Sequence, residues 1–503
     1  MQDTYGITPR LTLNAGVRWE YFGIQHNVNP ALDSNYYDGS GANIFQQIRN
    51  GAVDIANRSP AGGLWRPDYT DFGPRIGIAW DVFGDGKTSL RGGYGIGYER
   101  NFGNVTFNVI QNPPNYAVVS LFAGVDLPTI PISVDNAGPL AGNSGTKKLP
   151  NVSLRNVYSN IRTAYAHLLS ASLEHEFNRG LLASLSYSGS MGEGLYSISN
   201  YNPAGSGDVY LNDACTPGAT PGDPGNCTSR LRQTQYSNIN RRANGGISNY
   251  NSFIGRVLMR DIGGTGLTLD ANYTWSHAID NLSSTFSSAA SGNYVLGFLD
   301  PFAPLLDRGN ADFDIHNRVA ISGIYDIPLF KGNSLRDRIL GGWELAPIFT
   351  AHTGSPFTLF DCGQAYNFCP RAFINGVAPR SGVTNLATPG VPDNYQFYNL
   401  SNLQLASYVN PKVNISDFGP FPSNMVARNS VFGPGSWNLD MGVYKNTKLT
   451  ERFSLQLRFD AYNLFNHANF LVNAVDVDTP AYNFVDGYFN GNRNVQLGAK
   501  LIF

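Results

Sequence analysis

Hydrophobic and polar residues alternate along several segments of this 503-residue chain. At the C-terminus, apolar side chains occupy every second position from Val495 to Phe503, with polar residues or glycine between them except at Ile502. The same period of two runs from Leu11 to Tyr21, from Leu267 to Trp275 and from Phe453 to Ala461. Successive side chains of a β-strand point to opposite faces, so this period predicts strands with one apolar and one polar face.

We predict thirteen strands, the first of them the end of a truncated strand over residues 1–6. The other twelve are predicted at 10–22, 74–83, 87–100, 166–177, 181–190, 249–260, 266–279, 316–327, 341–353, 436–446, 452–465 and 494–503. Most are about ten residues long or slightly longer, which is the length that a tilted strand needs to cross a membrane. Trp and Tyr gather at the strand ends, as they do in the aromatic girdles of membrane barrels.

Short and long links alternate strictly between these strands. The short links centre on Thr8-Pro9, Gly84-Asp85-Gly86, Asn178-Arg179-Gly180, Ile262-Gly263-Gly264, Phe330-Lys331-Gly332 and Asn446-Thr447-Lys448. The long links cover about 23–73, 101–165, 191–248, 280–315, 354–435 and 466–493. Short periplasmic turns and long extracellular loops are typical of outer-membrane barrels, whereas a sandwich or propeller has no reason to keep this order. We therefore predict an all-β fold, a transmembrane antiparallel outer-membrane β-barrel.

The polar strand faces should line the interior of such a barrel. The residues that we expect to face the lumen, or a plug inside it, are Arg18, Glu20, Gly93, Gly95, Gly97, Arg458 and Asp460. The three glycines belong to a Gly-rich run that superficially resembles a phosphate-binding loop, but that motif requires a following helix. Here the glycines alternate with Tyr94, Ile96 and Tyr98 on one strand, so we interpret them as space inside the lumen.

Strand parity predicts that the barrel is incomplete in this sequence. The last strand follows a long loop, so the C-terminus lies on the side of the short turns. The first complete strand follows the short turn at Thr8-Pro9, so residues 1–6 end a strand that began on the outer side. Thirteen is an odd number, whereas bacterial single-chain barrels have an even number of strands. We expect residues 1–503 to be the C-terminal portion of a longer protein.

Composition excludes several other classes of protein. Charged residues make up 14% of the chain, against about 25% in a typical globular protein. Mean hydropathy is only -0.21, and no run of 18 apolar residues is present, which excludes transmembrane helices. The net charge of -2 without a basic block leaves nucleic-acid binding without an electrostatic footprint. Aromatic residues are 13% of the chain, too many for a disordered protein.

Four cysteines form two close pairs in Pro- and Gly-rich stretches, Cys215 with Cys227 and Cys362 with Cys369. Local pairs favour disulfides in an oxidising compartment over free thiols. Neither spacing is that of a zinc site, and no histidine lies between either pair. The first residues carry no signal peptide, so the chain is either cytoplasmic or begins at an internal position.

Few residues suggest reaction chemistry or a metal. Asp312, Asp314 and His316 offer carboxylates and an imidazole at the end of the loop 280–315, and we interpret them as a polar rim. Calcium binding by this loop stays open, although the spacing is not that of an EF-hand. The remaining histidines considered are scattered and are interpreted as strand-face or rim residues: His167, His175, His277, His352 and His467. We therefore predict no enzyme, no cofactor and no metal.

The long loops are the expected functional surface. They are rich in Asn, Gly, Pro, Ser and Tyr, as in the segment 392–398. Aromatic platforms with amide donors suit carbohydrate or peptide ligands, but loops of this composition also pack on themselves. For this reason the sequence predicts an unknown extracellular ligand without naming its contact residues.

Several stretches resemble the C-terminal barrel of TonB-dependent outer-membrane receptors, especially the Oar-like transporters. The most specific is RFDAYNLFNHANF at 458–470, which follows Thr450-Glu451-Arg452. The others are ARNSVFGPG at 427–435 with Trp437 to Asp440, the opening 2–21, the segment 72–77 and DFDIHNR at 312–318. The matches lie chiefly in the strands and extend over nearly the whole chain, whereas the loops show none.

The resemblance implies the last thirteen strands of a 22-stranded barrel around an N-terminal plug, which TonB pulls on. The plug, the TonB box and a preceding regulatory-like domain are absent from this sequence, so TonB would act only through a missing plug. Phe503 matches the family's C-terminal signal for the barrel-assembly machinery. The expected function is active uptake of bulky oligosaccharide- or peptide-like ligands across the outer membrane of a Gram-negative-type bacterium. The alternatives are a passive porin or surface adhesin and, from a third class, a secreted soluble β enzyme.

Overall fold

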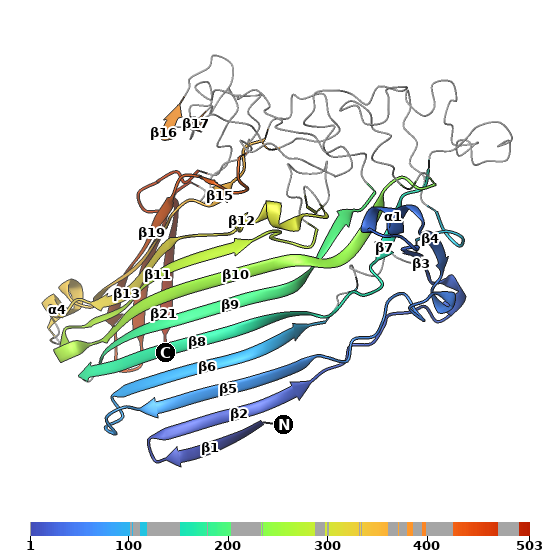
Figure 1. Ribbon diagram of the computed structural model, residues 1–503. Helices are drawn as coiled ribbons and strands as arrows, with labels where there is room; N and C mark the ends of the chain where they lie inside the picture. Colours follow the sequence, from blue (N-terminus) through green and yellow to red (C-terminus); the bar gives the residue numbers. More distant parts are fainter. Residues whose placement is uncertain are drawn as a thin grey trace.

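A computed structural model describes most of the chain. The described residues are 2–100, 103, 111–117, 151–178, 180–202, 233, 235–286, 297–298, 301–330, 332, 334–360, 371, 380–385, 395–398, 426–470 and 492–503. Within them, one large antiparallel sheet dominates and curves around a concave side (Figure 1). No described helix is long and apolar enough to cross a membrane.

All thirteen predicted strands are present in this sheet, and each pairs with its neighbour in chain order. They are β1 (Gln2–Thr8), β2 (Leu11–Trp19), β5 (Phe72–Asp81), β6 (Thr88–Glu99), β8 (Ala164–Asn178), β9 (Leu181–Asn200), β10 (Ile239–Arg260), β11 (Leu267–Asp280), β13 (Asn317–Asp326), β14 (Trp343–His352), β19 (Ser436–Lys448), β20 (Ser454–Tyr462) and β21 (Asn494–Ile502). β1 and β21 are the two edges of the sheet, and the described residues contain no pairing between them. The alternation of apolar residues therefore predicted the order of the strands.

The predicted ends of β9 at 190 and of β10 at 249 are wrong. β10 has 22 residues, and at about 3.4 Å per residue such a strand can extend roughly 75 Å. Its outer half continues to pair with β9 through two register shifts between Ala243 and Ser248. The alternation of apolar and polar residues stops in this outer part because loop segments cover it. The backbone pairing continues there, although neither face of the strands needs to be apolar. Gly194 adopts a positive φ of 59° at the irregularity, a conformation that glycine reaches without strain.

The register gives the large sheet one apolar and one polar face. On the apolar face, Leu13 lies opposite Ile78, and Leu90 lies opposite Leu173. Many large apolar side chains of this face are exposed, Leu185 among them. The polar face carries charged residues, and one ion pair there joins neighbouring strands, between Arg256 of β10 and Asp270 of β11. This is the division that a single sheet between lipid and water requires.

Tight turns join the strands at one end of the sheet, which we call the turn end. In the turn between β5 and β6, the Asp81 carboxylate accepts hydrogen bonds from the amides of Gly84 and Gly86. Both glycines have positive φ values, which the turn requires. The link between β13 and β14 is longer than a tight turn because it holds α4 (Leu335–Leu340), whose first turn is capped by Ser334. The long links leave from the opposite end, the loop end.

Smaller elements fold over the loop end. They are β3 (Ser34–Tyr37), α1 (Ile44–Arg49), β4 (Ala52–Ile55), β7 (Leu154–Val157), β12 (Gly309–Asn310), β15 (Pro356–Phe357), β16 (Arg380–Asn385), β17 (Tyr395–Tyr398), β18 (Val431–Phe432) and the 3-10 turns Pro30–Leu32, Ala56–Arg58 and Pro304–Asp307. A further 3-10 turn, Ile262–Gly264, lies at the turn end between β10 and β11. We call β3, α1, β4 and β7 the loop module. β7 joins it to the sheet through parallel pairing with the outer part of β10.

Two clusters of buried apolar residues lie in and around the loop module. One cluster joins Trp65, Val157 and Ala164 with their neighbours, and a second joins Tyr36, Leu154 and Ile239. Both clusters lie where loop segments meet the outer ends of β8 and β10. The described chain therefore combines a single-layer sheet with a small packed core at its loop end.

Candidate functional site

The charged residues predicted to face the lumen lie on the polar face of the sheet, but they do not form one site. Arg18 pairs with Glu20 at 2.7 Å near one edge. Arg458 lies 3.6 Å from Asp460 near the other edge. A third pair on this face joins Arg256 of β10 with Asp270 of β11 at 2.6 Å. These three pairs lie far apart along the sheet and suit a water-filled interior.

The glycines predicted to leave space in the lumen also belong to the polar face. Gly93 lies opposite Gly77 on one side and opposite Ser170 on the other. A methyl group added at Gly93 would approach the Ser170 hydroxyl to 3.1 Å, whereas at Gly97 it would meet Leu168 at an ordinary 3.8 Å. Of the three glycines, Gly93 therefore has the least space for a side chain. Contact with a plug stays a prediction.

Two other sets of sequence predictions remain untested. Cys215, Cys227, Cys362 and Cys369 lie outside the described residues, so their pairing stays a prediction. Phe503 follows β21 with a side chain that is 91% exposed. Its ring centroid lies 6.4 Å from that of Phe453. This exposed terminal ring is accessible to another protein, and its role as a signal for assembly stays a prediction.

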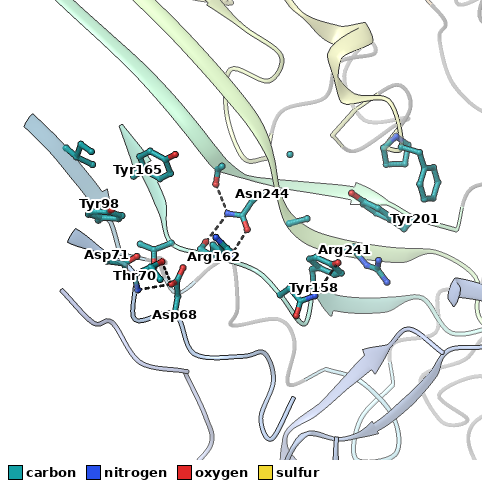
Figure 2. A pocket seen from close by; sticks show the side chains of 18 of the residues that line it. Asp68, Thr70, Asp71, Tyr98, Tyr158, Arg162, Tyr165, Tyr201, Arg241 and Asn244 are labelled. Atoms are coloured by element: carbon teal, nitrogen blue, oxygen red, sulfur yellow. Dashed lines mark hydrogen bonds between the residues drawn. The ribbon is translucent and has the colours of Figure 1, made fainter. Parts of the chain in front are cut away.

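A cavity of about 730 Å³ lies at the loop end, among the outer parts of β6, β8, β9 and β10. Figure 2 shows tyrosines, arginines and two aspartates around it. Its lining residues include Asp68, Asp71, Tyr98, Tyr158, Arg162, Tyr165, His167, Tyr201, Arg241, Asn244 and Phe302. They come from four of the long links predicted as the functional surface and from the adjoining strands. A cavity of this size can enclose a ligand of several rings or residues.

One wall of the cavity is fixed by the side-chain amide of Asn244. Its Oδ1 accepts a hydrogen bond from the amide of Arg162 at 2.7 Å. Its Nδ2 donates to the carbonyls of Arg162 at 2.9 Å and Gly194 at 2.6 Å. The amide therefore holds the segment before β8 against the irregular part of β9. This leaves the Arg162 guanidinium among the lining groups of a preformed wall (Figure 2).

The two aspartates of the cavity have different electrostatic environments. Burial raises the pKa of Asp68, but hydrogen bonds from the hydroxyl and amide of Thr70 outweigh this effect and hold its pKa below the ordinary value. Burial raises the pKa of Asp71, although a hydrogen bond from Thr163 opposes the shift. At neutral pH, Asp68 therefore supplies a firmly held negative charge. It can accept hydrogen bonds from hydroxyl or amide donors of a ligand.

Tyrosines form the aromatic part of the lining. The rings of Tyr98 and Tyr165 lie 5.7 Å apart. At the far end, the guanidinium of Arg241 lies over the ring of Tyr201 at 4.8 Å and over that of Tyr158 at 5.5 Å. Arg241 also forms a buried ion pair with Asp38. These contacts hold flat apolar faces next to polar groups, so the cavity offers both kinds of contact to a ligand.

The strand register decides which face of the sheet the cavity adjoins. Tyr98 lies opposite Tyr165, and both have the same parity as Leu90 and Leu173 on the apolar face. The cavity is therefore built at the outer end of the apolar side and not on the lumen-lining side. The sequence predicted the loops as the functional surface but named none of these residues as ligand contacts. His167 was interpreted as a strand-face or rim residue, and it lines the cavity.

The carboxylates predicted as one polar rim separate into two groups. Asp312 forms an ion pair with Arg428 at 2.9 Å, and the same guanidinium forms an ion pair with Asp280 at 2.5 Å. Asp314 lies instead beside His277 and His316. The sequence placed Asp312 and Asp314 together because they are two residues apart. The fold directs them to different partners, and only the second group has the donor set of a metal site.

A family model for the outer membrane β-barrel domain matches residues 1–496. No curated protein sequence matches the chain. Among solved structures, the outer membrane transporter YddB from Escherichia coli is similar at 12% identity and a TM-score of 0.43, over 98% of this chain and 43% of that one. The siderophore receptor PirA from Acinetobacter baumannii is similar at 10% identity and a TM-score of 0.41, over 99% and 44% respectively. The chain thus spans less than half the length of either protein.

Proposed function

Since this chain belongs to the outer membrane β-barrel domain family, we propose that its strands form part of the wall of a TonB-dependent transporter of the Oar-like type. The apolar face of the sheet contacts outer-membrane lipid, and the polar face lines the lumen. The ligands are bulky oligosaccharide- or peptide-like molecules taken up from outside the cell. TonB would act through a plug within the lumen, and the barrel-assembly machinery would insert the strands.

The observation that carries this proposal is the large cavity at the loop end. It combines the rings of Tyr98 and Tyr165 with the charged groups of Asp68 and Arg162. Aromatic faces provide contact area at low entropic cost, and flanking charged groups orient a polar ligand. Because the loop end is the extracellular end of an outer-membrane barrel, a ligand can reach this cavity from outside the cell.

The polar face of the sheet supports a wide interior. Thirteen strands pair in an arc whose edges, β1 and β21, do not meet among the described residues. Barrel diameter grows with strand number, and an arc of this size belongs to a barrel whose interior side chains cannot fill. The paired charges on β2 and β20 are compatible with water or with a polar plug. This width suits uptake of ligands larger than a simple nutrient.

A specific observation favours a second candidate, a surface adhesin. The strand residues of the cavity, Tyr98 and Tyr165, have the parity of the lipid-facing side. A ligand held there would stay at the outer rim of the barrel unless the loops move. A passive porin, in turn, would use the polar lumen without any need for the cavity. We propose no enzymatic activity for any of these candidates.

Uptake measured in energised and de-energised cells separates these functions. Cells that carry the full receptor are given fluorescent oligosaccharides or peptides, with and without a protonophore that dissipates the proton-motive force. Accumulation that stops with the protonophore supports the TonB-dependent transporter. Surface binding without accumulation supports the adhesin, and accumulation that ignores the protonophore supports the porin.

Replacing a cavity tyrosine tests the proposed ligand site. Tyr165→Ala removes one aromatic face, whose stacking is worth about 0.5–1.5 kcal/mol, so ligand affinity should fall about 2- to 12-fold. Equilibrium binding to whole cells measures the change. Tyr116→Ala is the matched control, because Tyr116 is an exposed loop tyrosine outside the cavity. Equal affinities for the two variants would exclude the cavity as the binding site.

A further inference from the structure

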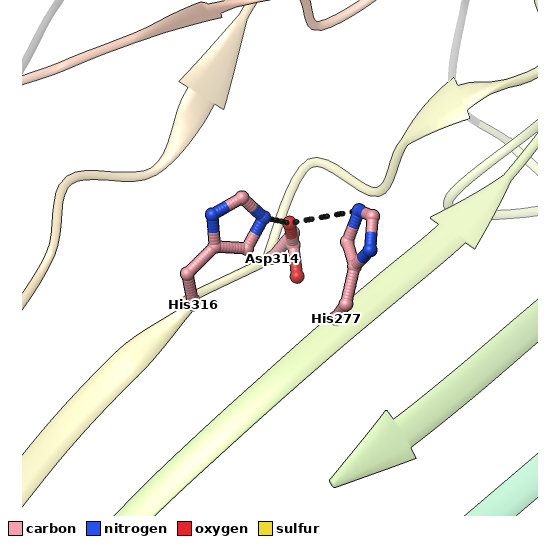
Figure 3. A group of neighbouring side chains, drawn as sticks. All are labelled: His277, Asp314 and His316. Atoms are coloured by element: carbon pink, nitrogen blue, oxygen red, sulfur yellow. Dashed lines mark ion pairs between the residues drawn. The ribbon is translucent and has the colours of Figure 1, made fainter.

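Two histidines and one aspartate meet at the loop end of β11. His277 belongs to β11, whereas Asp314 and His316 belong to the segment between β12 and β13. Figure 3 shows the two imidazoles on either side of the Asp314 carboxylate. One potential ligand atom from each residue lies within 4.8 Å of the other two. This cluster is separate from the cavity proposed for the bulky ligand.

The Asp314 carboxylate has one satisfied and one unsatisfied oxygen. Its Oδ1 accepts a hydrogen bond from the amide of Ala278 at 2.7 Å. Its Oδ2 lies 2.9 Å from Nε2 of His316 and 3.9 Å from Nε2 of His277. Nevertheless, neither Oδ2 of Asp314 nor Nε2 of His316 makes a hydrogen bond. Asp314 is 1% exposed, and a buried carboxylate oxygen requires a compensating partner.

The backbone around the cluster holds these side chains in place. The amide of Ser276 donates to the carbonyl of His316 at 3.0 Å, and the Ser276 hydroxyl donates to the carbonyl of Ile315 at 2.7 Å. On its other side, the His316 ring lies 5.0 Å from the ring of Phe432 in β18. The three potential ligands are therefore fixed by contacts that do not involve an ion. Such preorganisation lowers the cost of binding one.

We propose that His277, Asp314 and His316 bind one divalent transition-metal ion, with Zn²⁺ as the best-fitting species. Two imidazole nitrogens and one carboxylate oxygen form a ligand set that zinc sites use when one position stays open. Calcium requires six to eight oxygen ligands, and two of the three groups here are nitrogen donors. This proposal differs at Asp314 from the sequence-based expectation of a polar rim without a metal, which stays a prediction.

One hydrogen bond competes with the ion. Nε2 of His277 lies 2.9 Å from Oδ1 of Asn310 in a hydrogen bond. To bind the metal, this nitrogen must give up that hydrogen bond and be free of its proton. The Asn310 oxygen then remains beside the ion and is available as a fourth ligand. Both histidines are about one-third exposed on their side chains, at 34% and 35%. This exposure leaves a path for the ion and a position for water.

The ion would tether the loop end of β11 to the start of β13. His277 is three residues from the end of β11, and His316 directly precedes β13. A metal that joins them would fix the end of the long link between these two strands. The site therefore adds a structural role to the loops, and it depends neither on the transport proposal nor on the identity of the bulky ligand.

Zinc binding by the purified full chain in detergent tests the proposal. The chain is stripped with a chelator, titrated with ZnCl₂ by calorimetry and then assayed for bound zinc by elemental analysis. We expect one Zn²⁺ per chain. Asp314→Asn keeps an oxygen for the Ala278 amide but removes the charge. Removal of outer-shell partners alone costs 10- to 100-fold in affinity, so loss of this ligand should weaken binding by about 100-fold or more.

Replacing the two partly exposed histidines separates the loss of zinc binding from a loss of folding, which replacing the buried Asp314 could cause. His277→Ala and His316→Ala should each lose the zinc equivalent while retaining heat-modifiable migration on gels, the sign of an intact barrel. His175→Ala is the control, because His175 lies at the turn end and bonds to Thr88. The proposal is overturned if the unmodified chain binds no zinc, or if the three cluster variants bind it as tightly as the His175 variant.

Discussion

Asn35 is a fully buried amide in β3 that connects three separate segments. Its Nδ2 donates to the carbonyls of Leu64 at 2.9 Å and Val157 at 2.8 Å. Its Oδ1 accepts from the amide of Val157 at 3.0 Å and from the side chain of Asn156 at 2.9 Å. One side chain thus satisfies four buried polar groups. A satisfied network of this kind specifies a single arrangement of the loop module.

Asn35→Ala should therefore loosen the loop module without opening the barrel. Each buried polar group left unsatisfied costs about 1–3 kcal/mol, and relaxation should limit the total to about 3 kcal/mol. Amide hydrogen exchange in β7 should accelerate about 100-fold. Asn115→Ala, which removes a single exposed hydrogen bond to Ala31, should change this exchange little. Equal protection of β7 in both variants would contradict the role given to Asn35.

The ionisation of Tyr36 should make the loop module sensitive to base. Burial, and then repulsion by Asp38, raises the pKa of Tyr36 to about 12 from its ordinary 10.0. The folded state retains the phenol proton to a higher pH than the unfolded state. The stability that follows is fully present below pH 10 and is lost as the pH rises toward 12.

Tyr36→Phe separates this titration from that of other tyrosines. The variant loses the hydrogen bond to the Ile48 carbonyl, so it should be less stable at neutral pH by about 1 kcal/mol. It should nevertheless lose less stability than the unmodified chain between pH 10 and 12. Hydrogen exchange of the loop module at several pH values measures both effects. Parallel pH curves for the two proteins would show that Tyr36 does not control the base sensitivity.

Sequence reasoning succeeded least with individual residues. Arg18, Glu20, Arg458 and Asp460 have the parity of the polar face, because strand parity alone determines the side, and their place in a lumen stays a prediction. Asn35 gave no signal, since an asparagine in a loop is ordinary and its burial depends on partners more than a hundred positions away. The cavity tyrosines were equally hidden. Their positions depend on how four long links fold against one another.

The ends of the strands are connected by a buried arginine. Arg428, just before β18, forms ion pairs with Asp280 at the end of β11 and with Asp312 in the link that leads to β13. It also donates to the Ser283 hydroxyl at 2.7 Å. Arg428 and Asp280 are only 4% and 3% exposed on their side chains. Breaking a buried pair by removing one partner leaves an uncompensated charge.

Arg428→Met should destabilise the loop end of β11 by about 3–5 kcal/mol. Adding Asp280→Asn should recover part of this loss, because the buried negative charge then disappears together with its partner. Hydrogen exchange at residues 309–314 measures the effect, while heat-modifiable migration should remain in both variants. An additive second loss in the double variant would show that the two side chains act independently.

At the level of elements, the alternation of side chains predicted all thirteen strands and their order. It succeeded because the sheet lies at a boundary between lipid and water, with one face of each strand on either side, which imposes the period of two. It failed for the outer parts of β9 and β10, where pairing continues without that boundary. The segments ARNSVFGPG and DFDIHNR drew attention through family resemblance. The structure brings them together through Arg428 and Asp312.

The two faces of the whole sheet should respond differently to the same charge. Leu185 and Ser186 are neighbours on β9, but Leu185 belongs to the apolar face with Leu173 and Ser186 to the polar face with Ser172. Lysine on the lipid side near the bilayer midplane costs about 2–4 kcal/mol. Leu185→Lys should therefore reduce the fraction of folded barrel in the outer membrane, whereas Ser186→Lys should be tolerated. Heat-modifiable migration of membrane fractions measures both, and equal yields would contradict the assignment of the faces.

The parallel pairing of β7 with β10 has a consequence for biogenesis. Each of the thirteen long strands pairs with the next of them in the chain. β7 differs, because two complete strands, β8 and β9, lie between it and its partner β10. Contacts of such long sequence separation form late, since chain closure must be paid for before they can stabilise anything. Leu154 of β7 packs against Ile239 of β10, so we expect this contact to form only when β10 is in place. A chain that stalls before β10 is in place would therefore lack the cavity wall that Arg241 and Asn244 of β10 provide.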